Sequence, residues 1–253
     1  GYHFAKKCLT KGWQIASISS RKPKKTRYLP RVKYIICDIT KKRSLKQKVR
    51  KSFNYVVNLG GYVDHSNKKK TFESHYVGCK NLAEIFIKKM PIAFIQMGSS
   101  VEYGNSSSPQ KESVKCSLKS IKSIYGKAKL LSSRYMIDLY KKKNFPSVVL
   151  RLYLAYGPKQ DMNRFLPIII DGCIKNKKFP CSTGNQLRDF IHVDDVVDAI
   201  IKSLKNKNAK GQIINIGSGK PGKIKDIINH VKKISKGGFP QFGKIKLRKD
   251  EIL

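Results

Sequence analysis

A tyrosine and a lysine four residues apart, Tyr125 and Lys129, stand in the segment SIYGKAKLLSSRYM at 123–136. On a helix these two side chains share one face, about one turn apart. A tyrosine hydroxyl is a poor base at neutral pH, and an ammonium group one turn away favours its phenolate form, which can take up and return a proton. The pair therefore has the chemistry of a proton-transfer device, if the segment is a helix beside a ligand site.

The spacing of this pair is weak support by itself. The chain has 12 tyrosines and 44 lysines in 253 residues, and a lysine also follows Tyr2 and Tyr76 by four positions. What surrounds Tyr125 must therefore decide whether it is functional.

Short apolar runs rich in β-branched and aromatic residues alternate along the chain with helical patterns. The alternation predicts an α/β fold in which a parallel sheet is covered by helices on both faces. The predicted strands are 14–19, 33–37, 54–59, 92–97, 147–152 and 212–216. The predicted helices are 2–11, 41–51, 70–89, 119–143, 163–176, 193–205 and 223–235. Two polar stretches, 20–32 and 104–118, are expected to be loops.

Small or polar residues follow four of the predicted strands at the point where each strand ends. They are Asp38 after 33–37, Gly60 and Gly61 after 54–59, Gly98 to Ser100 after 92–97, and 153–158 after 147–152. Each is also a common turn residue. Ligands of open parallel sheets bind beyond the carboxyl ends of the strands, so four such ends in succession predict one ligand site.

The formal net charge of +38 raises the question of a polyanionic partner. Lysine outnumbers arginine by 44 to 10, although arginine is favoured in specific nucleic-acid contacts. The lysines are also scattered in twos and threes, as at 68–70 and 141–143. We expect a solvated, lysine-rich surface and no nucleic-acid partner. A catalytically idle protein that binds RNA or another polyanion is the alternative.

Composition also bears on the cellular compartment. No apolar run approaches the ~18 residues that span a bilayer, and no signal peptide is visible. The six cysteines have neither C-x-x-C spacing nor the pattern of a disulfide framework. We therefore expect a cytoplasmic protein with reduced thiols and no membrane partner.

Six motifs, in order and in spacing, resemble the extended short-chain dehydrogenase/reductase family of the NAD-dependent epimerase/dehydratase type. They are VVNLGG (56–61), MGSSVEYGN (97–105), YGKAK (125–129), RLYLAYGPKQ (151–160), RDFIHVDD (188–195) and INIGSG (214–219). The resemblance covers nearly the whole chain and is specific in combination.

The resemblance implies a Rossmann-like doubly wound parallel sheet with a small C-terminal substrate-binding subdomain. It places the NAD(P)-binding core at 1–158 and the substrate-binding portion at 159–253, with 187–218 returning to the core. It also implies that Gly1 is the last glycine of a G-x-x-G-x-x-G turn. The first strand and the C-terminal end of the family fold would then lie outside this chain.

The resemblance gives Ser99, Tyr125 and Lys129 catalytic roles. Tyr125 would exchange a proton with a sugar hydroxyl, Ser99 would hydrogen-bond the reacting oxygen, and Lys129 would also hold the nicotinamide ribose. Related 4,6-dehydratases usually carry an acidic pair where Ser100 and Val101 stand, and Glu102 is shifted by one position. We therefore expect a nucleotide-sugar epimerase or a 4-ketosugar reductase. The form GSSVEYG is also similar to CDP-linked dideoxysugar reductases.

The cofactor is expected to be NAD or NADP. Where NAD-dependent relatives carry an acid that binds the ribose 2′-hydroxyl, this chain has Ser19 followed by Arg21, which slightly favours NADP. Asp38 is the expected adenine contact, and Gly60 and Gly61 would let the backbone approach the pyrophosphate and ribose. The remaining cofactor-binding positions implied by the resemblance are Gly1, Ile39, Leu59, Tyr125, Lys129 and Tyr153.

Substrate binding is assigned by the resemblance to Ser100, Asn163, Arg164 and Arg188, of which Arg188 suits bidentate binding of the diphosphate. His192 is expected to be structural, with Asp194 or Asp195 capping the next helix. The histidines show no metal-ligand spacing, so no metal is expected. Leu154 and His75 replace asparagines that are common in the family, which leaves the sugar open. Relatives pair through the helices at 70–89 and 119–143, so a homodimer is expected.

Overall fold

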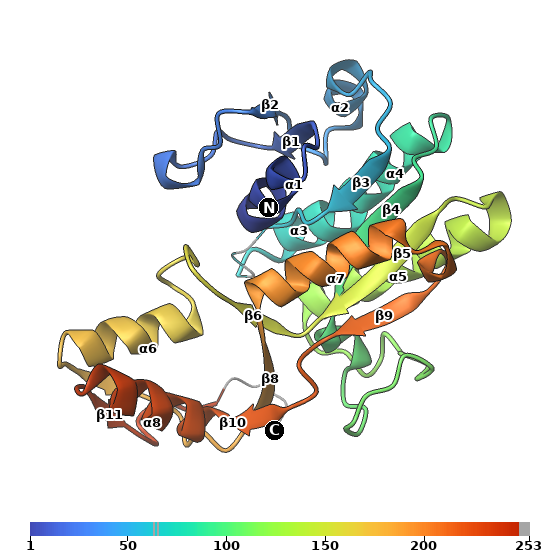
Figure 1. Cartoon of the computed structure of the whole chain (residues 1–253). Coiled ribbons are helices and arrows are strands. Elements are labelled where there is room, and N and C mark those ends of the chain that lie inside the picture. The colour runs from blue at the N-terminus through green and yellow to red at the C-terminus, as the bar shows by residue number, and fades with distance from the viewer. Residues whose placement is uncertain (63, 65, 248–253) are drawn as a thin grey trace. The chain divides into compact units, whose positions relative to one another are not determined.

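The computed structural model describes residues 1–62, 64 and 66–247, and the chain divides into two compact units (Figure 1). Unit 1 contains Gly1–Leu152 and Asp194–Ile216, and unit 2 contains Tyr153–Val193 and the chain from Gly217 onward. The unit boundary thus lies after 152, where 158 was expected. Of the expected returning segment 187–218, the first residues form strand β8, which pairs with β6 and β10 inside unit 2.

All strands of unit 1 pair in parallel. A four-stranded sheet has the order β3-β4-β5-β9, and a separate pair joins β1 to β2. The bounds are β1 Ile15–Ser19, β2 Val32–Ile36, β3 Tyr55–Asn58, β4 Ala93–Ser99, β5 Ser147–Leu152 and β9 Ile213–Ile216. Every residue of β4 is buried, as expected for a parallel strand that is covered on both faces.

Helices cover both faces of this sheet; in Figure 1, α7 lies in front of it and α4 behind it. The bounds are α1 Tyr2–Thr10, α2 Lys42–Lys48, α3 Lys68–Phe72, α4 Gly78–Ile87, α5 Ile124–Lys143 and α7 Val193–Lys205. One apolar cluster joins α2, α4 and α5 to the sheet through residues such as Leu45, Phe86 and Met136. A second cluster joins α1 to α7 through Cys8 and Val197. The predicted α/β architecture is confirmed.

The β1–β2 pair belongs to the same core. Ile18 of β1 and Ile35 of β2 pack against the first cluster. Trp13, just before β1, stacks on Tyr55 of β3 with ring centroids 5.2 Å apart. This packing brings the carboxyl ends of β1 and β2 into the same unit as those of β3, β4 and β5.

Two predicted helices differ from the observed ones for identifiable reasons. Helix α5 begins at Ile124, later than the predicted 119, because the Ser123 hydroxyl caps it by accepting the Gly126 N–H at 3.1 Å. The predicted helix 70–89 is observed as α3 and α4 joined by a π-helical turn, Glu73–Val77. Such turns are frequent at functional sites.

Unit 2 contains five short strands that the sequence patterns did not predict. Four of them have only three residues, and runs of that length carry too little periodicity. They are β6 Leu154–Tyr156, β7 Lys178–Pro180, β8 Leu187–His192, β10 Pro221–Lys223 and β11 Phe239–Gln241. Two predicted helices are present as α6 Phe165–Ile174 and α8 Ile224–Ser235. They pack on each other through Ile169, Cys173 and Ile228.

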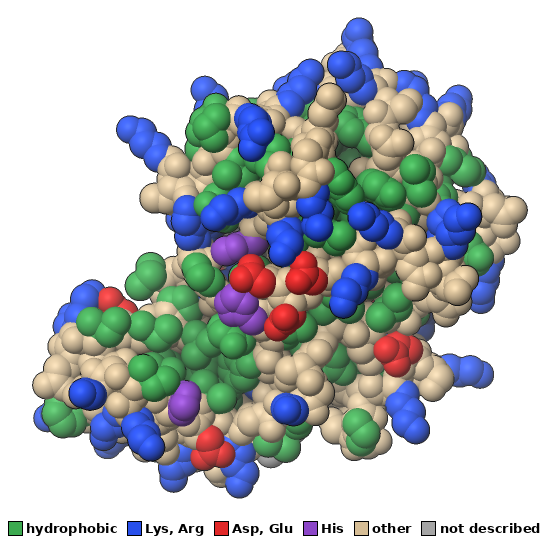
Figure 2. Space-filling view, in the orientation of Figure 1, with side chains coloured by type: hydrophobic (Ala, Val, Ile, Leu, Met, Phe, Trp, Pro, Cys, Tyr) green, Lys and Arg blue, Asp and Glu red, His purple; other side chains and the backbone are tan. Residues whose placement is uncertain are grey.

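The surface is rich in lysine and arginine. Figure 2 shows these side chains dispersed over the visible face, with few acidic side chains between them. Within the part of the chain that the structure describes, no helix is both long enough and apolar enough to cross a bilayer.

Candidate active site

Tyr125 and Lys129 lie one turn apart near the start of α5, as their spacing predicted. The Lys129 ammonium donates to the Met97 carbonyl of β4 at 2.7 Å, and its Nζ lies 5.8 Å from the centroid of the Tyr125 ring. Lys129 is only 4% exposed, whereas Tyr125 is half-buried. The cation is thus fixed to the sheet, whereas Tyr125 as a residue is partly exposed.

Ser99 is the last residue of β4, two positions beyond the carbonyl that binds Lys129. Its backbone N–H donates to Oε1 of Glu102 at 2.8 Å, which closes a capping box on the short 3-10 helix Ser100–Tyr103. Gly126 brings α5 close to this helix, because a Cβ at Gly126 would lie 3.3 Å from the Val101 carbonyl oxygen. Ser99 and Lys129 therefore belong to one end of β4, with the start of α5 packed beside it.

Glu102 does not face a ligand position. It is fully buried, and its Oε2 accepts the Nε–H of the buried Arg151 on β5 at 3.0 Å. The sequence had marked Glu102 only as an acid displaced by one position. Its partner could not be read from the sequence, because the two residues lie 49 positions apart.

His75 is a further neighbour of Tyr125 that the sequence noted only as a departure from the family. It is buried in the π-helical turn, and its ring meets the Tyr125 ring edge-on with centroids 4.9 Å apart. Its Nε2 lies 3.1 Å from the Tyr62 carbonyl oxygen. A Cβ at Gly61 would lie 1.9 Å from the His75 Cε1. The imidazole therefore fills the space beside Gly61 and links that strand end to Tyr125.

Several of the predicted cofactor-binding residues lie at the ends of β2 and β3. Asp38 is exposed and its Oδ1 accepts the Thr40 N–H at 2.9 Å, so it also forms the turn that was weighed as its other role. Ile39 packs against Gly78, where a Cβ would lie 2.7 Å from its Cδ1. Leu59 is half-buried, and the backbone at Gly60 and Gly61 is exposed.

The backbone that follows β3 is held by hydrogen bonds of Asn58. The Gly60 N–H donates to the Asn58 side-chain oxygen at 3.2 Å, and that buried side chain donates in turn to Gln96 on β4 at 2.7 Å. The backbone after β3 is thus fixed, exposed and free of side chains at two successive positions. Such a surface allows the close approach that a pyrophosphate and its ribose need.

Ser19, Arg21 and Gly1 also lie in unit 1. Ser19 ends β1, and its hydroxyl donates to the Arg21 carbonyl. The Arg21 side chain is exposed, and Gly1 is the exposed residue before α1. The loop after β1 therefore carries an exposed arginine two residues after Ser19.

The other predicted ligand residues are divided between the units. Ser100 begins the 3-10 helix of unit 1, whereas Tyr153, Asn163, Arg164 and Arg188 belong to unit 2. Asn163 is exposed and Arg164 is the residue before α6. Arg188 lies on β8, where its Nη1 donates to the Leu187 carbonyl at 2.6 Å.

Asp189, next to Arg188, was not singled out from the sequence. Its carboxylate accepts the backbone N–H groups of Ser218 and Gly219 at 2.7 and 2.8 Å. It thereby fixes the loop that follows β9. The His192 ring packs edge-on against the Tyr156 ring, with centroids 5.3 Å apart. Its structural role stays a prediction.

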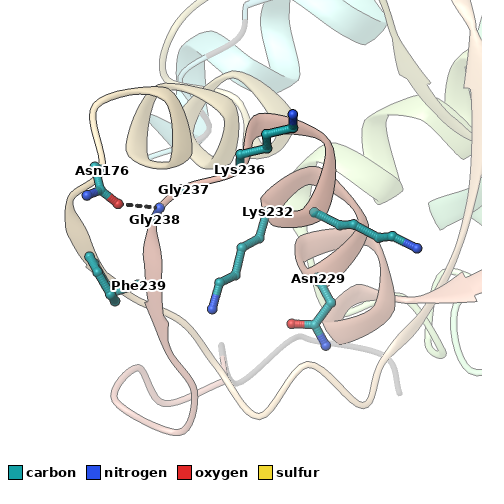
Figure 3. Close-up of a pocket in the computed structure, with 8 residues that line it drawn as sticks. Asn176, Asn229, Lys232, Lys236, Gly237, Gly238 and Phe239 are labelled. Carbon is teal, nitrogen blue, oxygen red and sulfur yellow. Dashed lines mark hydrogen bonds between the residues drawn. The ribbon is translucent and has the colours of Figure 1, made fainter.

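A hollow of about 570 Å³ in unit 2 holds none of the predicted site residues (Figure 3). Lys232, Lys233 and Lys236 line it, and Lys232 extends from α8 into the space beside Phe239. All three lie at the C-terminal end of α8, where positive charge complements the helix dipole. The lysines are thus explained without a ligand.

A family model described as the NAD dependent epimerase/dehydratase family matches residues 1–217. The chain belongs to this family. The predicted family is therefore confirmed, and with it the Rossmann-like fold. A first strand before Gly1 and the roles of individual site residues stay predictions.

Relatives within the epimerase/dehydratase family differ in activity. A CDP-abequose synthase of Salmonella muenchen is 31% identical over 136 residues, which are 51% of this chain and 46% of that protein. A dTDP-D-glucose 4,6-dehydratase of Dictyostelium discoideum is 27% identical over 183 residues, 67% of this chain and 42% of that protein. The matched segments thus span less than half of either relative.

A solved structure extends the likeness to nearly the whole chain. The UDP-glucose 4-epimerase of Thermotoga maritima with UDP-glucose superposes with a TM-score of 0.89 at 20% identity. The match covers 98% of this chain and 83% of that one. At this identity the likeness establishes the fold, and the activity must be argued from the site.

Proposed function

We propose that this chain carries the catalytic residues of an NAD(P)-dependent enzyme that acts on a nucleotide-linked sugar, as a 4-epimerase or a 4-ketosugar reductase. The observation that carries the proposal is the 2.7 Å hydrogen bond from Lys129 to the Met97 carbonyl. This bond seats the Tyr125–Lys129 pair against the end of β4, where Ser99 lies.

Each residue then has a defined task. A bound nicotinamide supplies or takes the hydride at the sugar carbon. Tyr125 takes the hydroxyl proton when the carbon is oxidised and returns a proton to the carbonyl oxygen when it is reduced. The Ser99 hydroxyl donates a hydrogen bond to that oxygen, and the Lys129 ammonium places a fixed positive charge beside the phenolate.

Dehydration is not part of the proposal, although some relatives are named 4,6-dehydratases. That reaction needs an acid–base group for a second carbon, and the only acid near the end of β4 in the motif is Glu102. Glu102 is fully buried and paired with Arg151, so it is not available to a sugar. Because CDP-abequose synthases match at 31% and 36% identity, a CDP-linked 4-ketosugar is the first substrate to test.

Replacement of Tyr125 by phenylalanine tests the proposal. We expect kcat to fall by about 100- to 10,000-fold, because the proton route is removed, while NADH affinity is kept. The matched control is Tyr76→Phe, since Tyr76 and Lys80 have the same spacing and a similar distance of 5.6 Å between Nζ and ring centroid. Turnover of CDP-, UDP- and dTDP-linked 4-ketosugars and hexoses by the full natural protein is the measurement. Turnover that survives Tyr125→Phe would contradict the assignment.

NADP is proposed as the slightly preferred cofactor because Ser19 is followed by the exposed Arg21 in the loop after β1. We expect Arg21→Ala to weaken NADPH binding by about tenfold, the loss of one charge-assisted contact, and to leave NADH binding unchanged. Fluorescence titration of both cofactors measures this, and Lys22→Ala, an exposed neighbour with the same charge, is the control. Equal losses for both cofactors would count against a 2′-phosphate contact.

Two further expectations accompany the proposed enzyme. A homodimer that pairs through the segments 70–89 and 119–143 is proposed from the resemblance, and sedimentation equilibrium tests it. An idle polyanion-binding protein remains the rival, supported by the charge of +38 alone. The lysine and arginine side chains in Figure 2 are dispersed rather than gathered in one patch. RNA binding that falls steeply with salt, in a protein without turnover, would favour the rival.

A further inference from the structure

A buried ion pair lies next to the Ser99 end of β4. The Arg151 Nε donates to Oε2 of Glu102 at 3.0 Å, and neither side chain exposes more than 3% of its surface. The second carboxylate oxygen, Oε1, accepts the backbone N–H of Ser99 at 2.8 Å. One carboxylate thus connects the guanidinium on β5 to the last residue of β4.

The surroundings hold Glu102 in this position. Gly98 leaves the space for it, because a Cβ there would lie 2.6 Å from Oε1. The Tyr103 ring lies 4.5 Å from the Cζ of Arg151, and its hydroxyl donates to Asn215 on β9 at 2.8 Å. Glu102 cannot turn toward a ligand without breaking this arrangement.

The guanidinium is a permanent anchor for the carboxylate. Burial opposes the charge of Arg151, but the attraction of Glu102 and the hydrogen bonding of Tyr103 outweigh it, so the pKa of Arg151 is raised above its ordinary value. The cation therefore does not titrate near neutral pH.

A pair of this kind is a poor choice for stability alone. Both charges lose their hydration, and apolar side chains of similar volume often serve a fold equally well or better. An ionised acceptor, by contrast, makes a shorter and stronger hydrogen bond to a backbone N–H than a neutral one does. What the pair adds is a fixed backbone at Ser99.

We propose that Glu102, held by Arg151, is a positioning residue that fixes Ser99 so that the serine hydroxyl meets the reacting oxygen of the sugar. The inference rests on the proposed function, in which Ser99 hydrogen-bonds that oxygen. Glu102 touches neither substrate nor cofactor and acts only through Ser99. Placement of a hydrogen-bond donor at a reacting oxygen is sensitive to shifts of less than 1 Å.

The test compares two double variants that share the loss of both charges. Glu102→Gln/Arg151→Met keeps an oxygen that can accept the Ser99 N–H, whereas Glu102→Leu/Arg151→Met does not. Neither leaves an unpaired charge in the core. The same two variants are also made with Ser99→Ala, which keeps the backbone N–H but removes the hydroxyl and, with it, the hydrogen bond that the hydroxyl accepts from the Glu102 backbone N–H.

We expect the glutamine variant to exceed the leucine variant in kcat by about tenfold or more, with KM and NADH affinity similar in both. With Ser99→Ala the difference should vanish, because Glu102 acts through the serine hydroxyl. Amide hydrogen exchange at Ser99 gives a second measurement that needs no turnover, and should be faster in the leucine variant. If Glu102 had a purely structural role, the variants would differ in their unfolding midpoints, and the difference in kcat would not depend on the Ser99 hydroxyl.

The remaining outcomes separate this inference from the proposed function. Suppose that the wild-type protein turns over and that Tyr125→Phe abolishes this turnover. If the glutamine and leucine variants then have the same kcat, or if their kcat values differ as much with Ser99→Ala as without it, the positioning role is overturned and the proposed function stands. If the wild-type protein converts none of the CDP-, UDP- or dTDP-linked sugars, the proposed function is overturned and this inference with it. If the leucine variant does not fold, the amide hydrogen exchange of Ser99 is compared between the wild type and the glutamine variant. Equal exchange rates support the role of the side-chain oxygen at position 102 as the acceptor, and faster exchange in the glutamine variant overturns it.

Discussion

Lys129 shows that anchoring, rather than spacing, distinguishes one tyrosine–lysine pair from another. Lys80 lies 5.6 Å from the centroid of the Tyr76 ring and equally close to that of Tyr135. Among the residues that the structure describes, its ammonium makes no hydrogen bond to the sheet backbone, whereas that of Lys129 donates to the Met97 carbonyl. A buried ammonium with a fixed acceptor stays in one place, whereas a half-buried lysine keeps most of its conformational freedom. Of these two pairs, the one on α5 therefore holds its charge at a defined point beside the phenol.

The buried thiols give a prediction at the scale of single residues. Burial raises the pKa of the Cys79 thiol to about 12, more than the nearby Lys129 lowers it, and burial raises the pKa of Cys8 to about 11. Above pH 9 the unfolded chain loses these protons while the folded protein keeps them. The two protonated thiols therefore make their full contribution to the free energy of unfolding below pH 9. This contribution is lost as pH rises toward 12, by up to about 1.4 kcal/mol per pH unit for each thiol.

Urea unfolding between pH 8 and pH 11 measures this loss. Cys79→Ala should flatten the decline of the unfolding free energy relative to wild type. Ser133→Ala, a buried change without a titrating group on that side chain, is the control. Parallel profiles for Cys79→Ala and wild type would show that the thiol does not titrate as expected.

At the scale of elements, the start of α5 determines how Tyr125 meets the sheet. Ser123 begins the helix, and Gly126 then allows it to approach the 3-10 helix that follows Ser99. The C-terminal end is fixed by Asn144, whose left-handed conformation at φ 51° closes the last turn. The close approach of the start of α5 to this 3-10 helix thus brings Tyr125 and Lys129 to the same end of β4 as Ser99.

Gly126→Ala tests this closeness. Alanine favours helix by about 1 kcal/mol over glycine. The added Cβ would, however, lie 2.7 Å from Cγ2 of the buried Ile121 and 3.3 Å from the Val101 carbonyl, and such overpacking costs about 1–3 kcal/mol. We expect a net loss of stability together with a fall in kcat, measured by urea unfolding and turnover. Lys127→Ala in the same turn is the control, and a stabilised, fully active Gly126→Ala would refute the close approach.

At the scale of the whole molecule, the charge of +38 acts on stability. Dispersed like charges repel one another in the compact state, and salt screens them. The three lysines at 68–70 add a local cost, because they crowd the N-terminal turn of α3, where the helix dipole disfavours cations.

Replacing these three lysines by glutamine should therefore raise the unfolding free energy at low ionic strength. The gain should shrink between 0.01 and 0.15 M NaCl, since the Debye length falls from about 30 to about 8 Å over that range. Thermal unfolding at both salt concentrations measures it. The same substitution at 141–143, in the last turn of α5 where lysine is favourable, is the control. A gain that does not depend on salt would contradict the electrostatic cause.

The alternation of strands and helices could be predicted from the sequence. So could the strand ends that carry Asp38, Gly60 and Ser99, and the shared helical face of Tyr125 and Lys129. These features follow from periodicity and turn chemistry, which act between residues close along the chain. Tertiary structure alone decided where Glu102 points, that His75 packs on Tyr125, and that the three-residue strands of unit 2 pair. The reason is physical: a buried carboxylate, an imidazole edge or a very short strand takes its place from partners that packing brings from distant segments, and no local pattern encodes that choice.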